Sequence, residues 1–591
     1  MTKILRRLSG KEWAQALISV AFIVAQVWLD LKLPDYMGEI TQLVQTPGSE
    51  MRAIWLNGGL MLLCALGSVV SAVTVGFFAA RIAASFSMRL RSLLFHKVES
   101  FSMEEINRFS TSSLITRSTN DVTHVQMLIV MGLQILIKAP ITAGWAITKI
   151  IGKGYEWSLA TAAAIVIMLA TCLFVMVFVV PKFRRMQTLT DNLTRVTRDS
   201  LTGLRVIRAY NAEAYQGRKF EAANAELTGT QLFTGRAMSI MMPVMSVVMG
   251  GINLVIYWIG AGLINRVELP GGLLEITDVL FPNMVTFSNY AMQVIMSFMM
   301  LAMIFILLPR AGVSARRINE VLETEAAIAE GTAAEGLPGL RGEVEFRGVS
   351  FKYPGAADYV LQDVSFRAKQ GETVAFIGST GSGKSTLINL VPRFFDATEG
   401  MVLIDGLDVK EYGLEALYNK IGYVPQRAVL FKGTVFSNVA YGDGARGTYG
   451  EDEVKRAVAV AQGTEFVEKM EGAYGAEVAQ GGTNVSGGQK QRLAIARAIC
   501  REPEIYIFDD SFSALDYKTD RTLRGALKKE TSGVTSLIVA QRIGTIMDAD
   551  RIVVLDEGRV AGIGTHKELL ETCGVYKEIA MSQLSEEELA V

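Results

Sequence analysis

Six long apolar segments in the first half of the chain set the strongest limit on its fold. A bilayer core of about 30 Å is crossed by roughly 20 helical residues, and each segment is long enough to do so. Residues 53–80 carry no charged side chain at all. The pattern therefore predicts a six-helix transmembrane bundle, with segments near 13–33, 53–80, 126–149, 157–181, 237–265 and 276–309.

The connections between these segments differ in length and in charge. Those after the first, third and fifth segments are short, with few Lys or Arg residues. Those after the second and fourth are long and basic, with Arg89 and Lys97 in one and Arg195 and Arg205 in the other. Because positive loops mark the cytoplasmic side, we expect the N-terminus, both long loops and the chain after Arg310 in the cytoplasm. Both loops also keep a helical apolar period with almost no Gly or Pro, so we expect them to be helical.

The overall composition supports a membrane half joined to a soluble half. Hydrophobic residues make up 50% of the chain, charged residues 20%, and the mean hydropathy is +0.30. The net charge of −1 provides no basic field for nucleic acid, so we expect no nucleic-acid partner. The four cysteines lack a metal or disulfide spacing. No small-residue cleavage site follows the first apolar segment, so we expect a retained helix in a multi-pass protein of the cell membrane.

The sequence pattern of the second half of the chain predicts an α/β domain. Residues 320–340 are rich in Ala, Glu, Thr and Gly and are typical of a linker. Beyond them, short apolar runs such as 373–377 and 536–539 alternate with helical stretches. We therefore expect a transmembrane domain with two long cytoplasmic coupling loops over 1–319, a linker over 320–340 and an α/β P-loop nucleotide-binding domain over 341–591.

A glycine-rich loop at the start of this domain has the pattern of a phosphate-binding loop. It follows a predicted strand and opens a helix, the context in which glycines bring backbone N–H groups close to phosphate. We expect Lys384 to reach the β- and γ-phosphates of ATP and the Ser385 hydroxyl to bind Mg²⁺. Asp509 ends an apolar strand and is the second predicted magnesium residue. The predicted loop contacts to ATP are Gly378, Ser379, Thr380, Gly381, Ser382, Gly383, Lys384, Ser385 and Thr386.

Residues 485–489, Val-Ser-Gly-Gly-Gln, resemble the signature motif of ATP-binding cassette (ABC) proteins. With six apolar segments ahead of one cassette, essentially all 591 residues resemble a half-transporter of the exporter type. This resemblance implies that two cassettes stack head to tail with two ATP molecules between them. Each ATP then touches the phosphate loop of one cassette and the signature of the other, here Ser486, Gly487, Gly488 and Gln489.

Other positions match the family by their local motifs. Tyr353 matches the aromatic residue that stacks on adenine, and Gln426 matches the glutamine that contacts Mg²⁺ and senses the membrane domain. Residues 513–516 match the loop that crosses the dimer interface. Residues 205–213 resemble the second coupling segment, which inserts into the partner cassette; a solvated basic helix is the alternative.

Two catalytic positions depart from the family pattern. Asp510 stands where a glutamate general base is expected, and its carboxylate is about an ångström further from the water that it should polarise. Gln541 stands where a switch histidine is expected, and an amide cannot shuttle a proton. Because the signature at 486–489 is intact, we interpret the chain as one half of a heterodimer with unequal ATP sites. A slow but competent homodimer is the alternative.

The sequence of the membrane half gives less information about the transported substrate than the second half gives about ATP. Methionines at 238, 241, 242, 245 and 249 and at 296 and 300 suit a promiscuous apolar pocket, or pack against neighbours or lipid. Lys138 is a charged residue inside a membrane segment. We expect it to face a cargo cavity, to lie at a subunit interface or to extend to the membrane–water interface. We expect ATP-driven export of amphipathic small molecules. An importer built on the exporter fold, and an ATP-gated channel or regulatory subunit, remain the alternatives.

Overall fold

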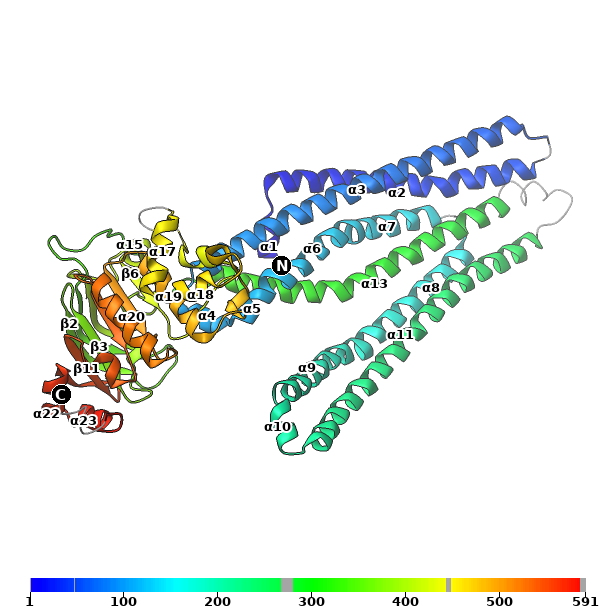
Figure 1. Cartoon of the computed structure of the whole chain (residues 1–591). Helices are drawn as coiled ribbons and strands as arrows, with labels where there is room; N and C mark the ends of the chain where they lie inside the picture. The colour runs from blue at the N-terminus through cyan, green and yellow to red at the C-terminus, as the bar shows by residue number, and fades with distance from the viewer. Residues whose placement is uncertain (1, 47, 152, 267–279, 443–447, 585–591) are drawn as a thin grey trace. The chain divides into compact units, whose positions relative to one another are not determined.

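The computed structural model describes residues 2–46, 48–151, 153–266, 280–442 and 448–584 of the 591-residue chain (Figure 1). These residues form two compact units. The first contains the chain up to Glu99 together with Ser112–Thr324, and the second contains Ser100–Thr111 together with the chain from Glu325. The described part of the first unit is helical, whereas the second unit combines strands with helices.

The first unit consists mostly of long helices, and wider π-type turns interrupt two helical stretches, one at η1 and η2 within Thr111–Ile150 and the other at η3 between α8 and α9. In chain order they are α1 (Thr2–Leu5), α2 (Gly10–Gln45), α3 (Met51–Glu99), α5 (Thr111–Thr116), η1 (Arg117–Asp121), α6 (Val122–Met131), η2 (Gly132–Ile137), α7 (Lys138–Ile150), α8 (Tyr155–Phe174), η3 (Val175–Val179), α9 (Val180–Thr202), α10 (Leu204–Ala209), α11 (Glu213–Ile264) and α13 (Phe281–Glu323).

The predicted apolar segments coincide with parts of these helices. Within the described residues, five helical stretches are long and apolar enough to cross a membrane, and Tyr155–Thr171 is a shorter apolar helix at the predicted fourth segment. The start of the predicted sixth segment, 276–279, lies outside the described residues. The five long stretches are Gly10–Gln45, Met51–Glu99, Thr111–Ile150, Glu213–Ile264 and Phe281–Leu301.

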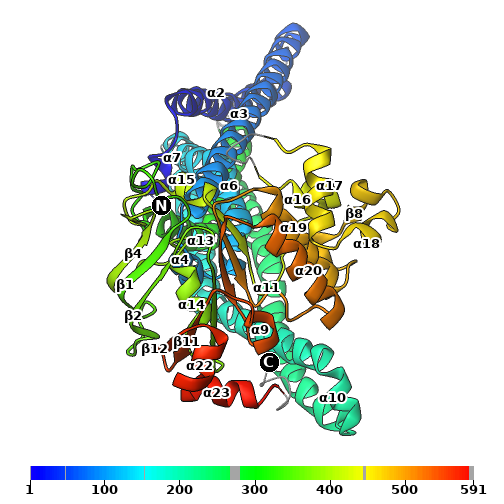
Figure 2. The ribbon, with the colours of Figure 1, turned by 60° about the vertical axis from the view of Figure 1, so that its left-hand side comes forward.

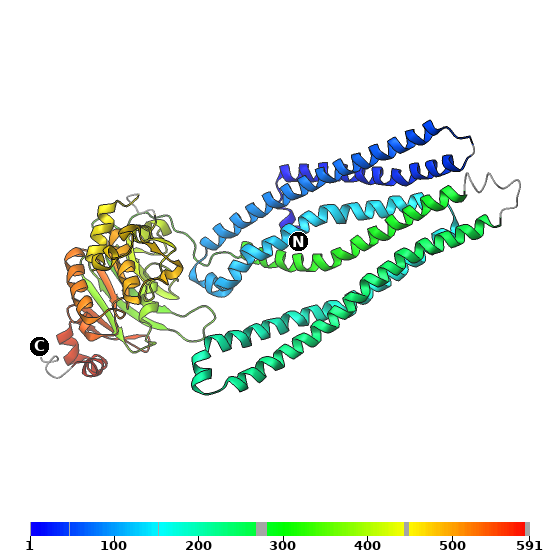
Figure 3. The same ribbon diagram turned by 45° about the vertical axis from the view of Figure 1, so that its right-hand side comes forward.

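The helices of the first unit pack in two groups. Helix α2 packs along α3, and α13 packs against α2, α6 and α7. Helix α11 packs along α8 and α9, and α10 joins α9 to α11 at one end of this pair (Figures 1 and 3). The apolar core between the helices includes Trp157 and Phe287, whose ring centroids lie 5.5 Å apart.

Two boundaries differ from the sequence-based ones. Helix α13 continues past residue 319 to Glu323, because Val321 and its neighbours still pack as a buried helical face. Residues Ser100–Thr111 group with the second unit although they lie between two apolar segments in the sequence. In that unit Ala327 N–H donates a 2.9 Å hydrogen bond to Glu105 Oε1, which fixes the short helix α4 (Met103–Phe109) to the chain after α13.

Three sheets build the second unit. A six-stranded sheet has the order β12-β11-β3-β10-β9-β6, and its strands are parallel except for the edge strand β12. A four-stranded sheet has the order β2-β1-β4-β5, and β7 pairs with β8. The strands are β1 (Val344–Phe351), β2 (Leu361–Ala368), β3 (Thr373–Gly378), β4 (Glu399–Ile404), β5 (Leu407–Asp408), β6 (Ile421–Val424), β7 (Gly433–Thr434), β8 (Glu477–Val478), β9 (Ile505–Asp509), β10 (Thr535–Val539), β11 (Arg551–Asp556) and β12 (Arg559–Gly564).

The central strands are buried on both faces, as expected for a parallel sheet. In β3, Val374 and Phe376 pack with β1, β2 and β4, whereas Ala375 and Ile377 pack with α21, α22 and α23. Helices α17, α19 and α20 pack over β9 and lie on the other side from β1, β2 and β4 (Figure 2). The described helices after α13 are α14 (Lys384–Asn389), α15 (Leu414–Asn419), α16 (Val435–Val439), α17 (Glu451–Val460), α18 (Thr464–Glu468), η5 (Ala473–Gly475), η6 (Gln480–Gly482), α19 (Gly487–Cys500), α20 (Tyr517–Glu530), α21 (Ile543–Ile546), α22 (His566–Thr572) and α23 (Gly574–Met581).

Candidate functional site

Three neighbouring strands bring the predicted ATP residues to one edge of the six-stranded sheet. Strands β3, β10 and β9 are parallel neighbours, so their carboxyl ends meet at that edge. The loop after β3 begins at Gly378, Asp510 directly follows β9, and Gln541 follows β10. The backbone N–H of Asp510 donates to the carbonyl of Val539, which ties the last two strand ends together.

The loop between β3 and α14 has a backbone that only glycine fits at its tightest points. A Cβ on Gly378 would lie 2.0 Å from the carbonyl oxygen of Leu555. Gly383 has φ +94°, and a Cβ there would lie 2.7 Å from Leu361. This explains why the loop carries glycine at both positions, and it leaves the backbone open to close approach by phosphate.

Lys384 begins α14 and folds back over this loop. Its Nζ donates hydrogen bonds to the carbonyl oxygens of Gly378 at 2.9 Å and Ser379 at 2.7 Å. Burial lowers the pKa of the Lys384 ammonium, and the carboxylates of Asp510 and Asp509 oppose that shift. A buried cation held by neutral carbonyls is poorly compensated, so triphosphate oxygens are a better partner for this lysine.

Ser385 and Asp509 lie together as predicted for a magnesium pair. Ser385 Oγ donates a 2.8 Å hydrogen bond to Asp509 Oδ1. Burial raises the pKa of Asp509, and the hydrogen bond from Ser385 acts in the opposite direction. Mg²⁺ uses one or two protein oxygens together with water and substrate phosphate. The oxygens of Ser385 and Asp509 therefore fit Mg-ATP. Among the described residues, no cluster of three or more His, Cys, Asp or Glu side chains suggests a site for another metal.

Two glutamine side chains donate hydrogen bonds to Asp510, which stands at the expected general-base position. Gln541 Nε2 donates to Asp510 Oδ2 at 2.9 Å, and Gln426 Nε2 donates to the same oxygen at 3.3 Å. Asp510 itself has φ +45°, in the left-handed region that Asp and Asn tolerate better than most residues. Burial raises the pKa of Asp510, and the hydrogen bond from Gln426 opposes that shift. Both positions that depart from the family pattern are therefore in direct contact.

Tyr353 is fixed beside the loop. Its hydroxyl lies 2.9 Å from Thr386 Oγ1, and its ring meets that of Phe395 edge to face at 5.3 Å. A cavity of about 210 Å³ borders Tyr353 and is also lined by Ser102 and Glu104 from the start of α4. The sequence analysis missed these last two residues; the only local signal was the Ser102–Glu105 capping box that begins the helix.

Among the described residues, the side-chain hydrogen bonds of the signature motif stay within the motif and do not reach the residues above. Ser486 caps α19, since its Oγ accepts from Gln489 N–H at 3.3 Å while Gln489 Oε1 accepts from Ser486 N–H at 2.9 Å. Ser486 and Gly487 are exposed. A Cβ on Gly488 would lie 3.4 Å from the carbonyl oxygen of Ala514, so the signature touches the predicted interface loop.

Comparison with known proteins identifies the family. Residues 361–513 match the family model described as ABC transporter, and residues 16–298 match the one described as ABC transporter transmembrane region. An uncharacterized ABC transporter ATP-binding protein of Mycobacterium tuberculosis is 40% identical over 526 residues, which are 89% of this chain and 87% of that protein. The chain belongs to the ABC transporter family.

Two further relatives of this ABC transporter refine its class. An ATP-dependent lipid A-core flippase of Pseudomonas aeruginosa is 31% identical over 535 residues, 89% of this chain and 85% of the flippase. A solved structure of a bacterial Atm1-family ABC exporter with ATP bound has the same fold, with a TM-score of 0.77 at 24% identity over 98% of this chain and 100% of that one. The ABC transporter is thus a multi-pass half-transporter with the fold of that exporter: a transmembrane domain followed by a cassette of the ABC ATPase family.

Two lysines of the membrane half of this ABC transporter, Lys138 and Lys149, are paired with carboxylates of the same chain. Lys138 Nζ lies 3.2 Å from Asp30 Oδ2, and Lys149 Nζ lies 2.7 Å from Asp35 Oδ2. Tyr290 on α13 donates a 2.5 Å hydrogen bond to Asp35 Oδ1. These contacts join α2 to α7 and α13, so Lys138 has an intrachain partner.

The methionines of the ABC transporter divide between core and surface. Met245 is buried in the helix core, and Met241 and Met249 pack against it. On α13, Met296 and Met300 are exposed at 39% and 44%. The side chain of the residue at 242 lies outside the described atoms. Met241, Met245 and Met249 therefore pack as ordinary core residues, and Met296 and Met300 on α13 are the exposed methionines of the predicted cargo surface.

Proposed function

We propose that this chain is one subunit of a heterodimeric exporter that moves amphipathic small molecules outward across the cell membrane with energy from Mg-ATP. In this proposal the chain's own ATP site is degenerate, and its signature completes the active site of a second half-transporter. The observation that carries the proposal is the contact of Asp510 with Gln541 and Gln426.

ATP binding at the chain's own site uses the residues at the end of β3. Tyr353 offers its ring to adenine, and the loop from Gly378 to Thr386 holds the phosphates. Lys384 would exchange its carbonyl partners for phosphate oxygens, and Ser385 with Asp509 would hold Mg²⁺. When bound, the nucleotide supplies a phosphoanhydride bond whose cleavage drives transport.

Hydrolysis at this site is expected to be slow because Asp510 is a weak general base here. Its side chain is one methylene shorter than glutamate, and one carboxylate oxygen already accepts two amide hydrogen bonds. A base must lie within hydrogen-bond reach of the proton that it takes, and a misplacement of about an ångström costs about a hundredfold. Gln541 adds no compensating chemistry, because an amide neither titrates nor shuttles a proton near pH 7.

The signature supports the second half of the proposal. Ser486 and Gln489 cap each other, so the N-terminus of α19 is formed and exposed for contact with another cassette. Backbone N–H groups at such a helix start stabilise phosphate charge. The two positions that would serve the chain's own ATP, Asp510 and Gln541, depart from the family pattern. The signature at 486–489, which would contact the partner's ATP, keeps that pattern. In this proposal, Gln426 senses the membrane domain. The segment 205–213, which overlaps α10, inserts into the partner cassette.

The substrate class rests on chemistry and on similarity. One relative is named a lipid A-core flippase, and lipid A-core is an amphipathic lipid. Met296 and Met300 give α13 a polarizable apolar surface, which suits amphipathic substrates of varied shape. We propose export, with the N-terminus and the nucleotide-binding domain in the cytoplasm as the basic loops indicate.

Copurification tests the heterodimer. The tagged chain, extracted from its native membranes, should bring down a second half-transporter in equal amount, whose sequence carries glutamate and histidine at the positions of Asp510 and Gln541. Recovery of this chain alone as an active homodimer would overturn the proposal in favour of slow, equivalent ATP sites. Transport in inverted vesicles then separates export from import, because export moves the substrate into the vesicle.

A further inference from the structure

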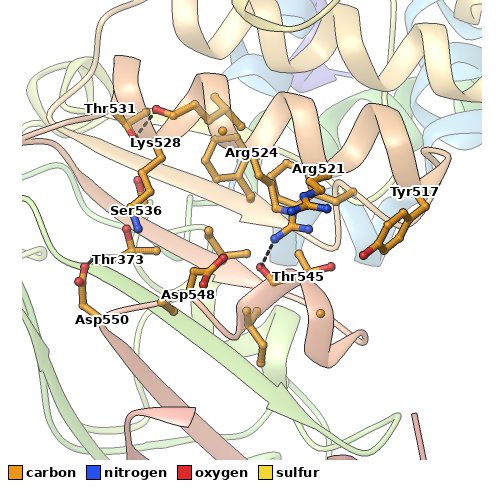
Figure 4. A pocket seen from close by; sticks show the side chains of 18 residues that line it. Thr373, Tyr517, Arg521, Arg524, Lys528, Thr531, Ser536, Thr545, Asp548 and Asp550 are labelled. Atoms are coloured by element: carbon orange, nitrogen blue, oxygen red, sulfur yellow. Dashed lines mark hydrogen bonds between the residues drawn. The ribbon is translucent and has the colours of Figure 1, made fainter. Parts of the chain in front are cut away.

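Two cavities in the described part of the second unit differ in what borders them. The larger has a volume of about 400 Å³ and lies between α20 and α21, where Asp548 is one of its lining residues (Figure 4). None of its described lining residues belongs to the phosphate loop. The smaller has a volume of about 210 Å³ and borders Tyr353. Pockets for drug-sized ligands have about 300–1,000 Å³, so the smaller cavity suits one part of a ligand, such as the base of a nucleotide.

Three aromatic rings line the smaller cavity, those of Phe351, Tyr353 and Phe395. The ring of Tyr353 meets that of Phe351 edge to face at 5.0 Å and that of Phe395 edge to face at 5.3 Å. Phe351 is buried in the core, so it anchors the other two rings. The hydroxyl of Tyr353 lies 2.9 Å from Oγ1 of Thr386, the last residue of the predicted phosphate contacts. The phosphate loop and the cavity therefore meet at Tyr353.

Helix α4 also lines this cavity, through Ser102 and Glu104 at its start. The neighbouring Glu105 is fully used in holding the helix. Its Oε2 accepts from the N–H and the hydroxyl of Ser102 at 2.8 and 2.7 Å, and its Oε1 accepts from Ala327 N–H at 2.9 Å. Among the described residues, the carboxylate of Glu104 makes no hydrogen bond or ion pair, although its residue is partly buried.

The other polar side chains of the cavity have partners. The second acidic one, Asp396, is paired with Arg393 at 2.8 Å. Thr398 Oγ1 accepts a 3.2 Å hydrogen bond from Lys352 N–H. The carboxylate of Glu104 is therefore left to accept from a ligand, and hydrogen bonds to an ionised acceptor are among the stronger ones. Adenine offers N–H donors at its 6-amino group.

We propose that Glu104 accepts a hydrogen bond from the 6-amino group of adenine when ATP occupies this chain's own site. The contact presupposes the proposed function, in which the phosphates lie in the loop from Gly378 to Thr386 and the base lies beside Tyr353. It makes Glu104 a binding residue that sets which base the site prefers. Helix α4 follows α3 in the chain and precedes α5, so the bound base contacts a segment that continues into both helices.

Competition for photolabelling of this chain, in the assembled full-length transporter, tests the contact. An azido-ATP analogue labels the site, and ATP or purine riboside triphosphate, which lacks only the 6-amino group, displaces it. We expect ATP to bind about tenfold more tightly than the analogue, the size of one hydrogen bond to a charged acceptor. Glu104→Ala should lower that preference to less than about twofold, by weakening ATP and leaving the analogue unchanged. Glu104→Gln should keep part of the preference, because an amide oxygen still accepts.

Two controls separate this contact from other effects of the change. Asp548→Ala removes one carboxylate from the larger cavity of the same unit and should leave the preference intact (Figure 4). 2′-Deoxy-ATP keeps the 6-amino group, so its affinity relative to ATP should be the same in the unmodified chain and in Glu104→Ala. The helix should stay formed in Glu104→Ala, because its capping contacts come from Ser102 and Glu105.

The proposal is overturned if Glu104→Ala leaves the preference for ATP unchanged, or if it weakens ATP and the analogue equally, as a purely structural role of α4 requires. A preference for ATP over 2′-deoxy-ATP that disappears in Glu104→Ala would assign the carboxylate to the ribose. Label that ATP fails to displace from the unmodified chain would contradict the proposed function itself. Displacement by ATP and by the analogue at equal concentrations would contradict only the contact with Glu104.

Discussion

Asp510→Asn is the sharpest test of unequal ATP sites. It removes the carboxylate base and keeps the size and shape of the side chain. Asparagine also tolerates the left-handed backbone at this position, where φ is +45°. We expect ATP turnover of the assembled transporter to stay within about twofold of the unmodified protein, because a weak base contributes little to the total rate.

The structure predicts that this change leaves the domain folded. Asp510 Oδ2 accepts from Gln541 at 2.9 Å and from Gln426 at 3.3 Å, and an asparagine oxygen can accept both. Gln541 is exposed, so water replaces any bond that is lost there. The cost is about 1 kcal/mol, against about 5–15 kcal/mol for the stability of a domain. A loss of activity at an unchanged melting temperature would therefore report chemistry and not unfolding.

The assay is steady-state ATP hydrolysis in lipid nanodiscs, with photolabelling of each site by an azido-ATP analogue. Asp509→Asn is the matched control, since the same atom change one residue earlier weakens the predicted magnesium pair with Ser385. It should lower labelling of the chain's own site, whereas Asp510→Asn should leave labelling unchanged. A fall in turnover of about a hundredfold or more from Asp510→Asn, the size of a working general base, would refute the unequal-site reasoning.

Three other predictions use the same preparation. Asp510→Glu with Gln541→His should raise hydrolysis at the chain's own site about tenfold or more, measured with the partner's glutamate removed; unchanged hydrolysis would show that the site is degenerate beyond these two residues. Gly488→Asp should abolish turnover by placing a carboxylate beside the partner's ATP, yet spare labelling of the chain's own site; the reverse pattern would contradict the head-to-tail assignment. Lys138→Met should leave Asp30 unpaired and destabilise the membrane domain by roughly 1–3 kcal/mol, which Lys138→Met with Asp30→Asn should largely recover; equal melting temperatures of the single and double variants would contradict the pairing.

Local patterns in the sequence predicted the fold class, and the structure brings the candidate ATP-site residues to one sheet edge, because both depend on short stretches of chain. The apolar segments are set by length and hydropathy, and the helices occupy them. The strand before Gly378 and the strand ending at Asp509 are continuous apolar runs, and parallel packing brings their ends together. The 2.8 Å contact of Ser385 with Asp509 follows from that topology.

Long-range contacts were the part that the sequence could not supply. The partner of Lys138 is Asp30, more than a hundred positions away, and no local period connects them. Helix α4 groups with the nucleotide-binding domain, and a hydrogen bond from Ala327 to Glu105 joins two segments that are more than two hundred positions apart. Such pairings are decided by tertiary packing, which short motifs do not encode.

The structure also gives the two departures from the family pattern a common physical meaning. Asp510 and Gln541 follow neighbouring strands, and their side chains bond each other, so in the proposed function they serve the same nucleotide. The signature begins α19, and among the described residues its side-chain hydrogen bonds stay within the motif, as the proposed role at the partner's nucleotide requires. If two equivalent sites hydrolysed ATP, each copy would need both a strong base and a formed signature. A chain that keeps only the signature therefore fits a machine in which one site hydrolyses ATP and the other mainly binds it.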